Sequence, residues 1–254
     1  MKKQIHIFFT ALMFFTRIPC PKWIDHSPEI LNKSTRYFSL VGLLVGTISA
    51  FFYLVAAQLF TAEIALVISM IASVWTTGAF HEDGFADVCD GFGGGWTKDK
   101  ILLIMKDSRL GTYGVVGLVF ILVIKFLALY DIPKEYIVLT IISGHSISRF
   151  AATALIFTHP YVRDTNDSKS KPAADKMSLN SFMVNAFFGL LPLVLFQNPK
   201  IFFVLIPLGI TKWWLSGFFK KWIGGQTGDC AGALQQLSEV IYYLSLVALW
   251  KYIW

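Results

Sequence analysis

The sequence predicts an all-α, polytopic transmembrane helical bundle, and three observations support this. Of the 254 residues, 55% are hydrophobic and only 15% are charged, and the mean hydropathy is +0.59, which is typical of integral membrane proteins. Several apolar runs are long enough to cross a bilayer, which takes about 20 helical residues. No internal repeat or low-complexity tract divides the chain, so we expect a single integral-membrane domain over residues 1–254.

Seven apolar segments are candidates for membrane spans. The third and fifth are short, so we expect their helices to extend into flanking residues. In chain order the seven segments are Phe38–Phe60, Ile64–Phe80, Val115–Tyr130, Tyr136–Thr158, Phe182–Phe196, Ile201–Phe219 and Val240–Trp254.

The N-terminal apolar run, Ile5–Phe15, follows Lys2 and Lys3 and imitates a signal peptide. No small-residue cleavage site comes after it, so we expect it to stay uncleaved. We predict a short helix at the membrane interface that is stopped by Pro19 and Pro21. Packing against the core is an equally good interpretation of this segment.

The distribution of positive charge predicts the orientation. Sixteen Lys and Arg residues lie in the first 37 residues and after the second, fourth and sixth spans, whereas the other three connections hold two. Positive loops stay in the cytoplasm, so the N-terminus should be cytoplasmic and the C-terminus outside. The net charge of +6 follows from these residues. It calls for no nucleic-acid partner and favours anionic lipids and phosphorylated ligands.

An acidic segment, residues 81–91, is the most distinctive part of the chain. On a helix, Asp83, Asp87 and Asp90 fall within an arc of about 60°, and apolar residues between them face the other way. No Lys or Arg lies within four residues of any of them. Like charges at this spacing repel, so the pattern favours a hard divalent cation such as Mg²⁺. The alternative is a solvated acidic face, which the neighbouring membrane makes less favourable.

Two further segments carry basic residues that could neutralise phosphate. Lys106 and Arg109 follow the acidic segment, although basic residues beside a cytoplasmic helix end are also expected from topology alone. Arg149 lies mid-way along the fourth span, where it needs a carboxylate, a phosphate or a water-filled cavity. His145, one turn earlier, is more often a neutral hydrogen-bonded residue than a ligand.

The connection after the sixth span is glycine-rich and ends in Thr227, Gly228 and Asp229. Glycines just before a helix N-terminus present backbone N–H groups to an anion, a geometry that suits phosphate. Asp229 is either an ordinary helix N-cap or a further metal ligand or base. The polar, basic loop from residue 159 to 180 is expected to form a flexible cover.

These motifs together resemble the cobalamin-5′-phosphate synthase family, also called adenosylcobinamide-GDP ribazoletransferases. The resemblance runs in order from about residue 8 to residue 240. Its motifs are Phe-Thr-Arg-Ile-Pro at 15–19, His-Glu-Asp-Gly-Phe-Ala-Asp-Val-Cys-Asp-Gly at 81–91, Met-Lys-Asp-Ser-Arg and the glycines up to 114, and Thr-Gly-Asp at 227–229.

The resemblance implies an enzyme of the bacterial or archaeal inner membrane whose active site faces the cytoplasm. Such an enzyme completes nucleotide-loop assembly in cobalamin biosynthesis. With Mg²⁺, it joins adenosylcobinamide-GDP to α-ribazole, or its 5′-phosphate, and releases GMP.

The resemblance also implies roles for particular residues. Asp83, Asp87 and Asp90 would bind metal and pyrophosphate, and Glu82 is a further metal candidate at a position where the family often has Leu. Phosphate would be neutralised by Lys106, Arg109 and Arg149. The substrate or its nucleotide would contact Arg17, Thr227, Gly228 and Asp229.

Two other functions fit parts of the pattern. A CDP-alcohol head-group transferase also carries an aspartate-rich cytoplasmic helix, but it requires Arg after the Ala, where this chain has Asp87, and a last aspartate spacing of four, not three. A transporter would place its carboxylates inside a span instead of at its edge. The sequence leaves the oligomeric state open, a homo-oligomer included.

Overall fold

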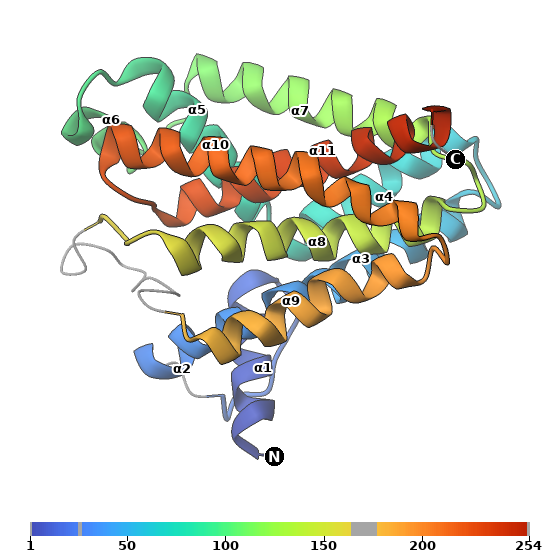
Figure 1. Ribbon diagram of the computed structural model, residues 1–254, viewed down its shortest axis with the longest axis horizontal. Coiled ribbons are helices and arrows are strands. Elements are labelled where there is room, and N and C mark those ends of the chain that lie inside the picture. Colours follow the sequence, from blue (N-terminus) through green and yellow to red (C-terminus); the bar gives the residue numbers. More distant parts are fainter. Residues whose placement is uncertain (1, 25–26, 164–176, 253–254) are drawn as a thin grey trace.

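A computed structural model describes residues 2–24, 27–163 and 177–252, and the regular secondary structure of these parts is helical except for one isolated bridge. The long helices lie side by side along the long axis, whereas α1 runs across them (Figure 1). In chain order the elements are α1 (Lys2–Phe15), α2 (Pro28–Ser34), the 3-10 helix η1 (Thr35–Tyr37), α3 (Phe38–Ala56), α4 (Ala62–Thr77), α5 (Phe80–Gly94), α6 (Lys98–Ile104), α7 (Thr112–Tyr130), α8 (Ile137–Thr158), α9 (Leu179–Val194), the 3-10 helix η2 (Pro199–Val204), α10 (Leu205–Ile223) and α11 (Gly228–Tyr252).

The all-α prediction is confirmed, and the number of spans is confirmed only in part. Within the described residues, four helices are long and apolar enough to cross a membrane, or up to five if the bent pair α4 and α5 is one span. The four are 29–56, 112–130, 137–158 and 199–223. Helix α9 has only 16 residues, and α11 carries buried polar residues along its first half. Seven spans are therefore not shown.

The predicted second span ends in a sharp turn. Gly78 and Ala79 both adopt left-handed backbone conformations, with φ of 66° and 60°, and α5 leaves α4 at 88°. Glycine reaches this region freely, whereas Ala79 does so at a steric cost. The turn sends α5, which carries the aspartates, across the end of α4 instead of continuing it.

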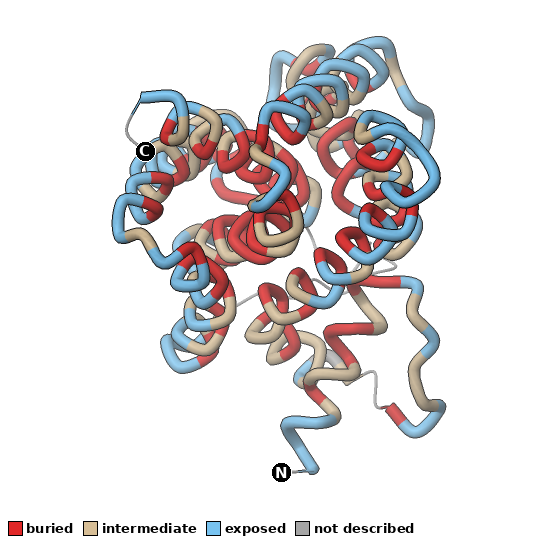
Figure 2. Tube along the Cα trace, turned by 90° about the vertical axis from the view of Figure 1, so that its right-hand side faces the viewer, coloured by how far each residue is buried: buried red, intermediate tan, exposed pale blue. Residues whose placement is uncertain are grey.

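Close glycine packing joins α3 to α8. A Cβ atom on Gly42 would lie 2.3 Å from the carbonyl oxygen of His145, and one on Gly46 would lie 2.7 Å from Cα of Ile142. Only glycine allows two helix backbones to approach this closely. Helix α8 lies in the middle of the bundle (Figure 1) and is buried along most of its length. Buried residues concentrate in the interior of the molecule (Figure 2).

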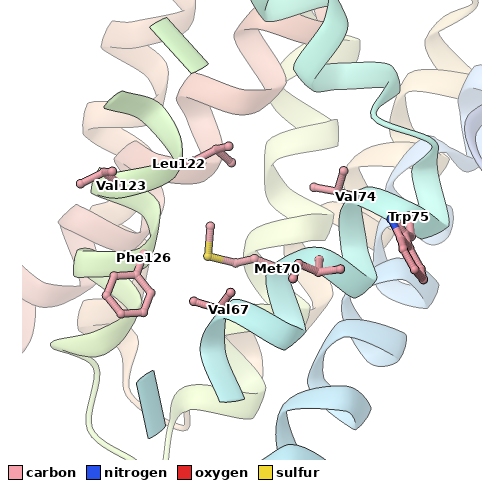
Figure 3. Close-up of a pocket in the computed structure, with 8 residues that line it drawn as sticks. Val67, Met70, Val74, Trp75, Leu122, Val123 and Phe126 are labelled. Carbon is pink, nitrogen blue, oxygen red and sulfur yellow. The ribbon is translucent and has the colours of Figure 1, made fainter. Parts of the chain in front are cut away.

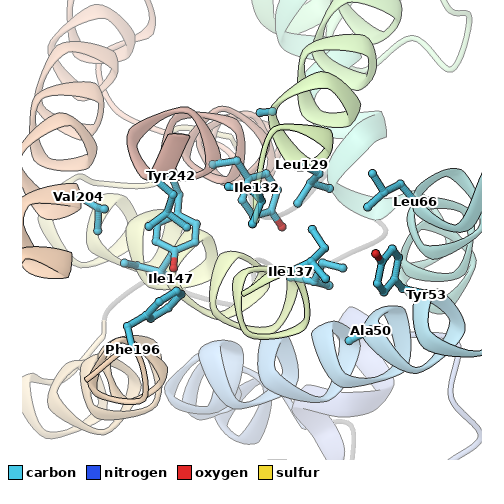
Figure 4. Close-up of a cluster of buried hydrophobic side chains, with 14 of the residues drawn as sticks. Ala50, Tyr53, Leu66, Leu129, Ile132, Ile137, Ile147, Phe196, Val204 and Tyr242 are labelled. Carbon is cyan, nitrogen blue, oxygen red and sulfur yellow. The ribbon is translucent and has the colours of Figure 1, made fainter. Parts of the chain in front are cut away.

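The largest apolar cluster fills the end of the bundle away from α5 and α6. Its residues come from α3, α4, α7, α8, α9, η2, α10, α11 and the connections between them. They include Tyr53, Leu66, Ile137 and Tyr242 (Figure 4). The hydroxyl groups of Tyr242 and Ser143 lie 2.7 Å apart, so the buried phenol is hydrogen-bonded. This apolar end leaves the polar chemistry to the opposite half of the molecule.

The N-terminal helix packs against the bundle. Ala11, Leu12 and Phe15 of α1 join a buried cluster with residues of α3, α8 and α11, and the ring of Phe15 stacks on Phe38 with centroids 4.1 Å apart. The predicted helix is confirmed, and it ends at Phe15, before the two prolines. Its contacts support the core-packing interpretation.

Candidate active site

Helix α5 presents an acidic face, as the aspartate spacing predicts. Asp83 is exposed and Asp87 and Asp90 are partly exposed. On the opposite face, Phe85 is buried among residues of α7 and α11. The helix therefore has one side that packs and one side that offers carboxylates.

A glycine crossing brings α11 against this helix. A Cβ atom on Gly84 would lie 3.0 Å from Cα of Asp229 and 3.5 Å from Cα of Gly232. Asp229 consequently starts α11 beside the acidic face. Asp87 interacts electrostatically with three carboxylates, those of Asp229, Asp83 and Asp90.

Asp229 forms an ion pair with Arg163, a residue that the sequence did not single out. The Nη2 atom of Arg163 donates to Oδ2 of Asp229 at 2.5 Å and to the carbonyl oxygen of Met105 at 3.2 Å. Burial raises the pKa of Asp229 above its ordinary value, and Arg163 acts in the opposite direction. One guanidinium thus ties the start of α11 to the end of α6 beside the acidic face.

The N-cap interpretation of Asp229 is wrong. Thr227 precedes α11, and its hydroxyl accepts a hydrogen bond from the backbone N–H of Cys230 at 3.2 Å, which is the bond of an N-cap residue. Thr227 is fully buried. Gly228 is exposed, and a Cβ atom there would meet nothing within 4 Å. Their contact with substrate stays a prediction.

The loop before α11 is fixed by the chain that follows α8. The backbone N–H of Val162 donates to the carbonyl oxygen of Gln226 at 3.0 Å, and that of Gln226 donates to Pro160 at 2.9 Å. These bonds hold Arg163 opposite Asp229. The rest of the predicted flexible cover, residues 164–176, lies outside the described residues.

Asp90 makes a contact that the sequence did not predict. Its two carboxylate oxygens accept hydrogen bonds from the backbone N–H groups of Gly111 and Gly114, at 2.7 and 2.9 Å. A Cβ atom on either glycine would lie within 2.5 Å of the carboxylate. The two glycines therefore let the start of α7 approach Asp90, and the carboxylate is stabilised by the N-terminus of that helix.

The basic loop between α6 and α7 lies beside Asp90. Arg109 is highly exposed, and its guanidinium bonds both oxygens of Asp107, with the shortest N–O distance at 2.6 Å. The hydrogen bonds from Arg109 lower the pKa of Asp107 to about 2. Exposed ion pairs are weak, so a phosphate can compete for Arg109. Lys106 is exposed on the same loop.

Arg17 follows α1 in the chain and is exposed, and its side chain packs against the turn between α4 and α5. Its backbone N–H donates to the carbonyl oxygen of Thr76 at 2.8 Å. A Cβ atom on Gly78 would overlap the Arg17 side chain. Its role toward substrate stays a prediction.

The predicted phosphate residue Arg149 lies elsewhere, inside the bundle. It is 1% exposed, and its Nη1 donates to the carbonyl oxygen of His145 at 2.7 Å. Its electrostatic partners are Glu239 of α11 and Glu82 of α5. The sequence predicted a carboxylate, a phosphate or a water-filled cavity for this arginine, and the structure places two carboxylates of other helices within electrostatic range.

A family model described as CobS, cobalamin-5-phosphate synthase, matches residues 7–247. The chain belongs to the cobalamin-5-phosphate synthase family. Proteins named adenosylcobinamide-GDP ribazoletransferase from Shewanella frigidimarina and Shewanella pealeana are each 47% identical to it, with 97% and 98% of this chain and 95% and 97% of the relatives covered. The similarly named protein of Shewanella oneidensis is 42% identical, with 96% of this chain and 95% of the relative covered. No solved structure matches the chain.

The acidic face of α5 in this member of the family has carboxylates that suit Mg²⁺. The described residues contain no preformed group of three or more His, Cys, Asp or Glu side chains that could hold a metal. Mg²⁺ needs only one or two carboxylates, because water and substrate phosphates complete its shell. Asp83 and Asp87, one turn apart on one face, fit that requirement. Glu82 is 92% buried and bonds Gln236 instead.

A buried polar network lies beneath this face. Glu239 is its centre, with Lys125 Nζ at 3.3 Å, His145 Nδ1 at 3.5 Å and the amide of Gln235 at 2.8 Å. Of these residues, only His145 was singled out from the sequence. Lys125 offered a signal, since it is a lone charge inside a predicted span. Glu239 directly precedes the predicted last span and resembled an ordinary loop carboxylate.

One open groove of this family member is apolar and contains no charged residue, whereas Arg17 lines a neighbouring one. Val67, Met70 and Val74 of α4 face Leu122 and Phe126 of α7 across a groove of about 480 Å³ (Figure 3). Nothing in its lining can bind a phosphate or a metal. The acidic face of α5, with Asp229 and Arg163, is therefore the better candidate for the active site.

Proposed function

We propose that this chain joins adenosylcobinamide-GDP to α-ribazole, or to its 5′-phosphate, and releases GMP, the last step of nucleotide-loop assembly in cobalamin biosynthesis. One observation supports this site most: carboxylates from two helices, Asp83 and Asp87 on α5 and Asp229 on α11, lie together beside Arg163. Family membership supports this reaction over a head-group transferase or a transporter.

Asp83 and Asp87 are the proposed Mg²⁺ residues. When bound there, Mg²⁺ would neutralise pyrophosphate oxygens and stabilise the charge that develops on the leaving GMP. Asp90 and Glu82, which the sequence also suggests as metal ligands, are not part of this proposed set. Asp90 is engaged with the amides of α7, and Glu82 points into the bundle toward Gln236.

The remaining residues of the site act on the substrate's phosphates. In the reaction, a ribose hydroxyl attacks the cobinamide-side phosphorus and loses its proton to solvent. The bond from that phosphorus to the bridging oxygen breaks, and the oxygen leaves with the electron pair as part of GMP. Lys106 and Arg109 approach from the exposed loop to neutralise phosphate charge. Arg163 holds Asp229 in place, so that the acidic face stays open to the substrate.

The site lies at the cytoplasmic surface of the inner membrane in this proposal. The bias of sixteen Lys and Arg residues against two supports that orientation. Helices α4, α9 and α11 would then cross the membrane together with the four long apolar helices, which makes seven crossings.

The test is transfer by the purified, detergent-solubilised chain. We expect GMP release to require adenosylcobinamide-GDP, α-ribazole and Mg²⁺, and to stop when Mg²⁺ is chelated. A CDP-activated lipid precursor with an alcohol acceptor is the matched control and should give no product. Release of CMP from that control, without GMP release from the first pair, would contradict the proposal.

A further inference from the structure

The buried network beneath the acidic face contains more buried charge than stability alone explains. Four charged side chains are almost wholly buried: Glu82 is 8% exposed, Lys125 4%, and Arg149 and Glu239 1% each. Buried ion pairs are often no more stable than apolar residues of the same size. The network therefore calls for a role in addition to holding the bundle together.

We infer that Gln236 is a positioning residue for the acidic helix, linking Glu82 of α5 to Lys125 of α7. Its Oε1 accepts a hydrogen bond from Lys125 Nζ at 2.9 Å. Its Nε2 donates to Glu82 Oε1 at 3.0 Å and to Gln235 Oε1 at 2.9 Å. Gln236 is 2% exposed, so it acts through α5 and does not touch substrate.

The chemistry of the partners fixes the orientation of this amide. A lysine ammonium only donates hydrogen bonds and a carboxylate only accepts them. The amide oxygen of Gln236 must therefore face Lys125, and its NH₂ group must face Glu82. If the amide were rotated by 180°, its NH₂ group would face the ammonium of Lys125 and its oxygen would face the carboxylate of Glu82, so both hydrogen bonds would be lost.

The link reaches the active site through the helix itself. Glu82 immediately precedes Asp83, and successive side chains on a helix differ in direction by about 100°. Holding Glu82 inside the bundle thus fixes the rotation of α5 and aims Asp83 and Asp87 outward. Catalytic groups need such fixed geometry, because a shift of about 1 Å can cost about a hundredfold in rate.

Helix α5 is held on α7 at both ends by this arrangement. At its far end Asp90 bonds the amides of Gly111 and Gly114 at the start of α7. At its near end Glu82 reaches Lys125, further along the same helix, through Gln236. The two carboxylates proposed for Mg²⁺ lie between these anchors. Glu82 and Asp90 thereby serve as anchors of the acidic face.

A swap of the two partners tests the link. Gln236→Glu places a second carboxylate against Glu82, and we expect transfer to fall by about tenfold or more. In Glu82→Gln with Gln236→Glu, the amide at 82 can donate to the carboxylate at 236, which still accepts from Lys125. Both variants lose the donor to Gln235 Oε1, so they differ only at residue 82. The buried charge of the double variant is unchanged, so we expect it to be at least about threefold more active than Gln236→Glu. A double variant as inactive as Gln236→Glu would overturn the inference.

The swap also separates positioning from metal binding. If Glu82 were a metal ligand, its replacement by Gln would keep the activity of the double variant as low as that of Gln236→Glu and would raise the Mg²⁺ concentration needed for its half-maximal rate. The inference rests on the proposed transfer activity. Failure of that function is distinguishable, because the unaltered chain would then release no GMP.

A neutral pair of variants covers the case in which Gln236→Glu does not fold. Gln236→Met removes the link to α5. Gln235→Met removes an equally buried amide that bonds Ser148, Glu239 and Gln236, but it leaves the bonds of Gln236 to Glu82 and Lys125 in place. We expect both to lower the melting temperature in detergent by similar amounts. Only Gln236→Met should lower kcat by about tenfold. Equal loss of kcat in both would assign Gln236 to packing.

Discussion

Arg163 shows at the residue scale how this family member keeps a partly buried carboxylate, that of Asp229, beside the acidic face. Its guanidinium bonds Asp229 on α11 and the carbonyl oxygen of Met105 after α6. Asp229 would otherwise add to the repulsion around Asp87. The planar guanidinium directs the two N–H bonds of Nη2 at both acceptors in a fixed geometry, whereas a lysine ammonium is a freely rotating point charge.

We therefore expect Arg163→Lys to lower transfer by about tenfold despite keeping the charge, and Arg163→Met to lower it further. The measurement is kcat/KM for adenosylcobinamide-GDP. Arg36→Lys is the control, because Arg36 also bonds a side chain on another helix, Ser181 of α9, but lies away from the acidic face. An active Arg163→Met variant would remove this residue from the site.

Local sequence spacing predicted the acidic face, whereas the other residues of the site depend on contacts between segments that are distant in the sequence. The positions of Asp83 and Asp87 on one side of a helix follow from periodicity alone. Arg163 could not be recognised in this way, because its partner lies 66 residues away. The same applies to Asp90, whose predicted metal role competes with two backbone amides that no spacing rule reveals.

At the scale of elements, the two contacts of α5 with α7 and α11 decide where the carboxylates lie. Asp90 stabilises the start of α7 by accepting hydrogen bonds from two of its otherwise unpaired N–H groups.

Asp90→Ala should therefore lower the free energy of unfolding by about 1–2 kcal/mol. Thermal unfolding in detergent measures this. Asp131→Ala, an exposed aspartate at the other end of α7, should unfold like the unaltered chain.

The crossing of α5 and α11 makes a second prediction. Gly84→Ala forces a Cβ atom to within 3.0 Å of Cα of Asp229, so the helices must separate. We expect a loss of about 1–3 kcal/mol in stability and lower transfer activity. Gly217→Ala in α10 is the control, since a Cβ atom there meets nothing within 4 Å. Gly84→Ala with unchanged stability and activity would show that the crossing tolerates a wider spacing.

At the scale of the whole molecule, hydropathy predicted the helical bundle but not every crossing. The boundaries of α3, α7 and α8 agree with the predicted spans to within a few residues. The predicted second span ends at the turn where α5 leaves α4 at 88°. The predicted seventh span corresponds to the second half of α11. Hydropathy cannot show a bend, because it averages over the residues around Gly78 and Ala79.

The orientation of the bundle gives a prediction at this scale. In a variant lacking the three native cysteines, Thr97→Cys should react with an impermeant thiol reagent only when the cytoplasmic side is accessible. Glu135→Cys, between the third and fourth predicted spans, should react from outside. Both native residues are exposed. Labelling of Thr97→Cys in intact cells would reverse the orientation and move the site out of the cytoplasm.

The central claim is that Asp83 and Asp87 form the catalytic face, and GMP release by single variants tests it most directly. We expect Asp83→Asn and Asp87→Asn each to lower kcat/KM by about a hundredfold or more at every Mg²⁺ concentration, with no loss of melting temperature, because an amide removes the charge without removing a packed side chain. Asp99→Asn, an exposed aspartate at the start of α6, should remain fully active. Near-normal rates in both α5 variants would contradict the account.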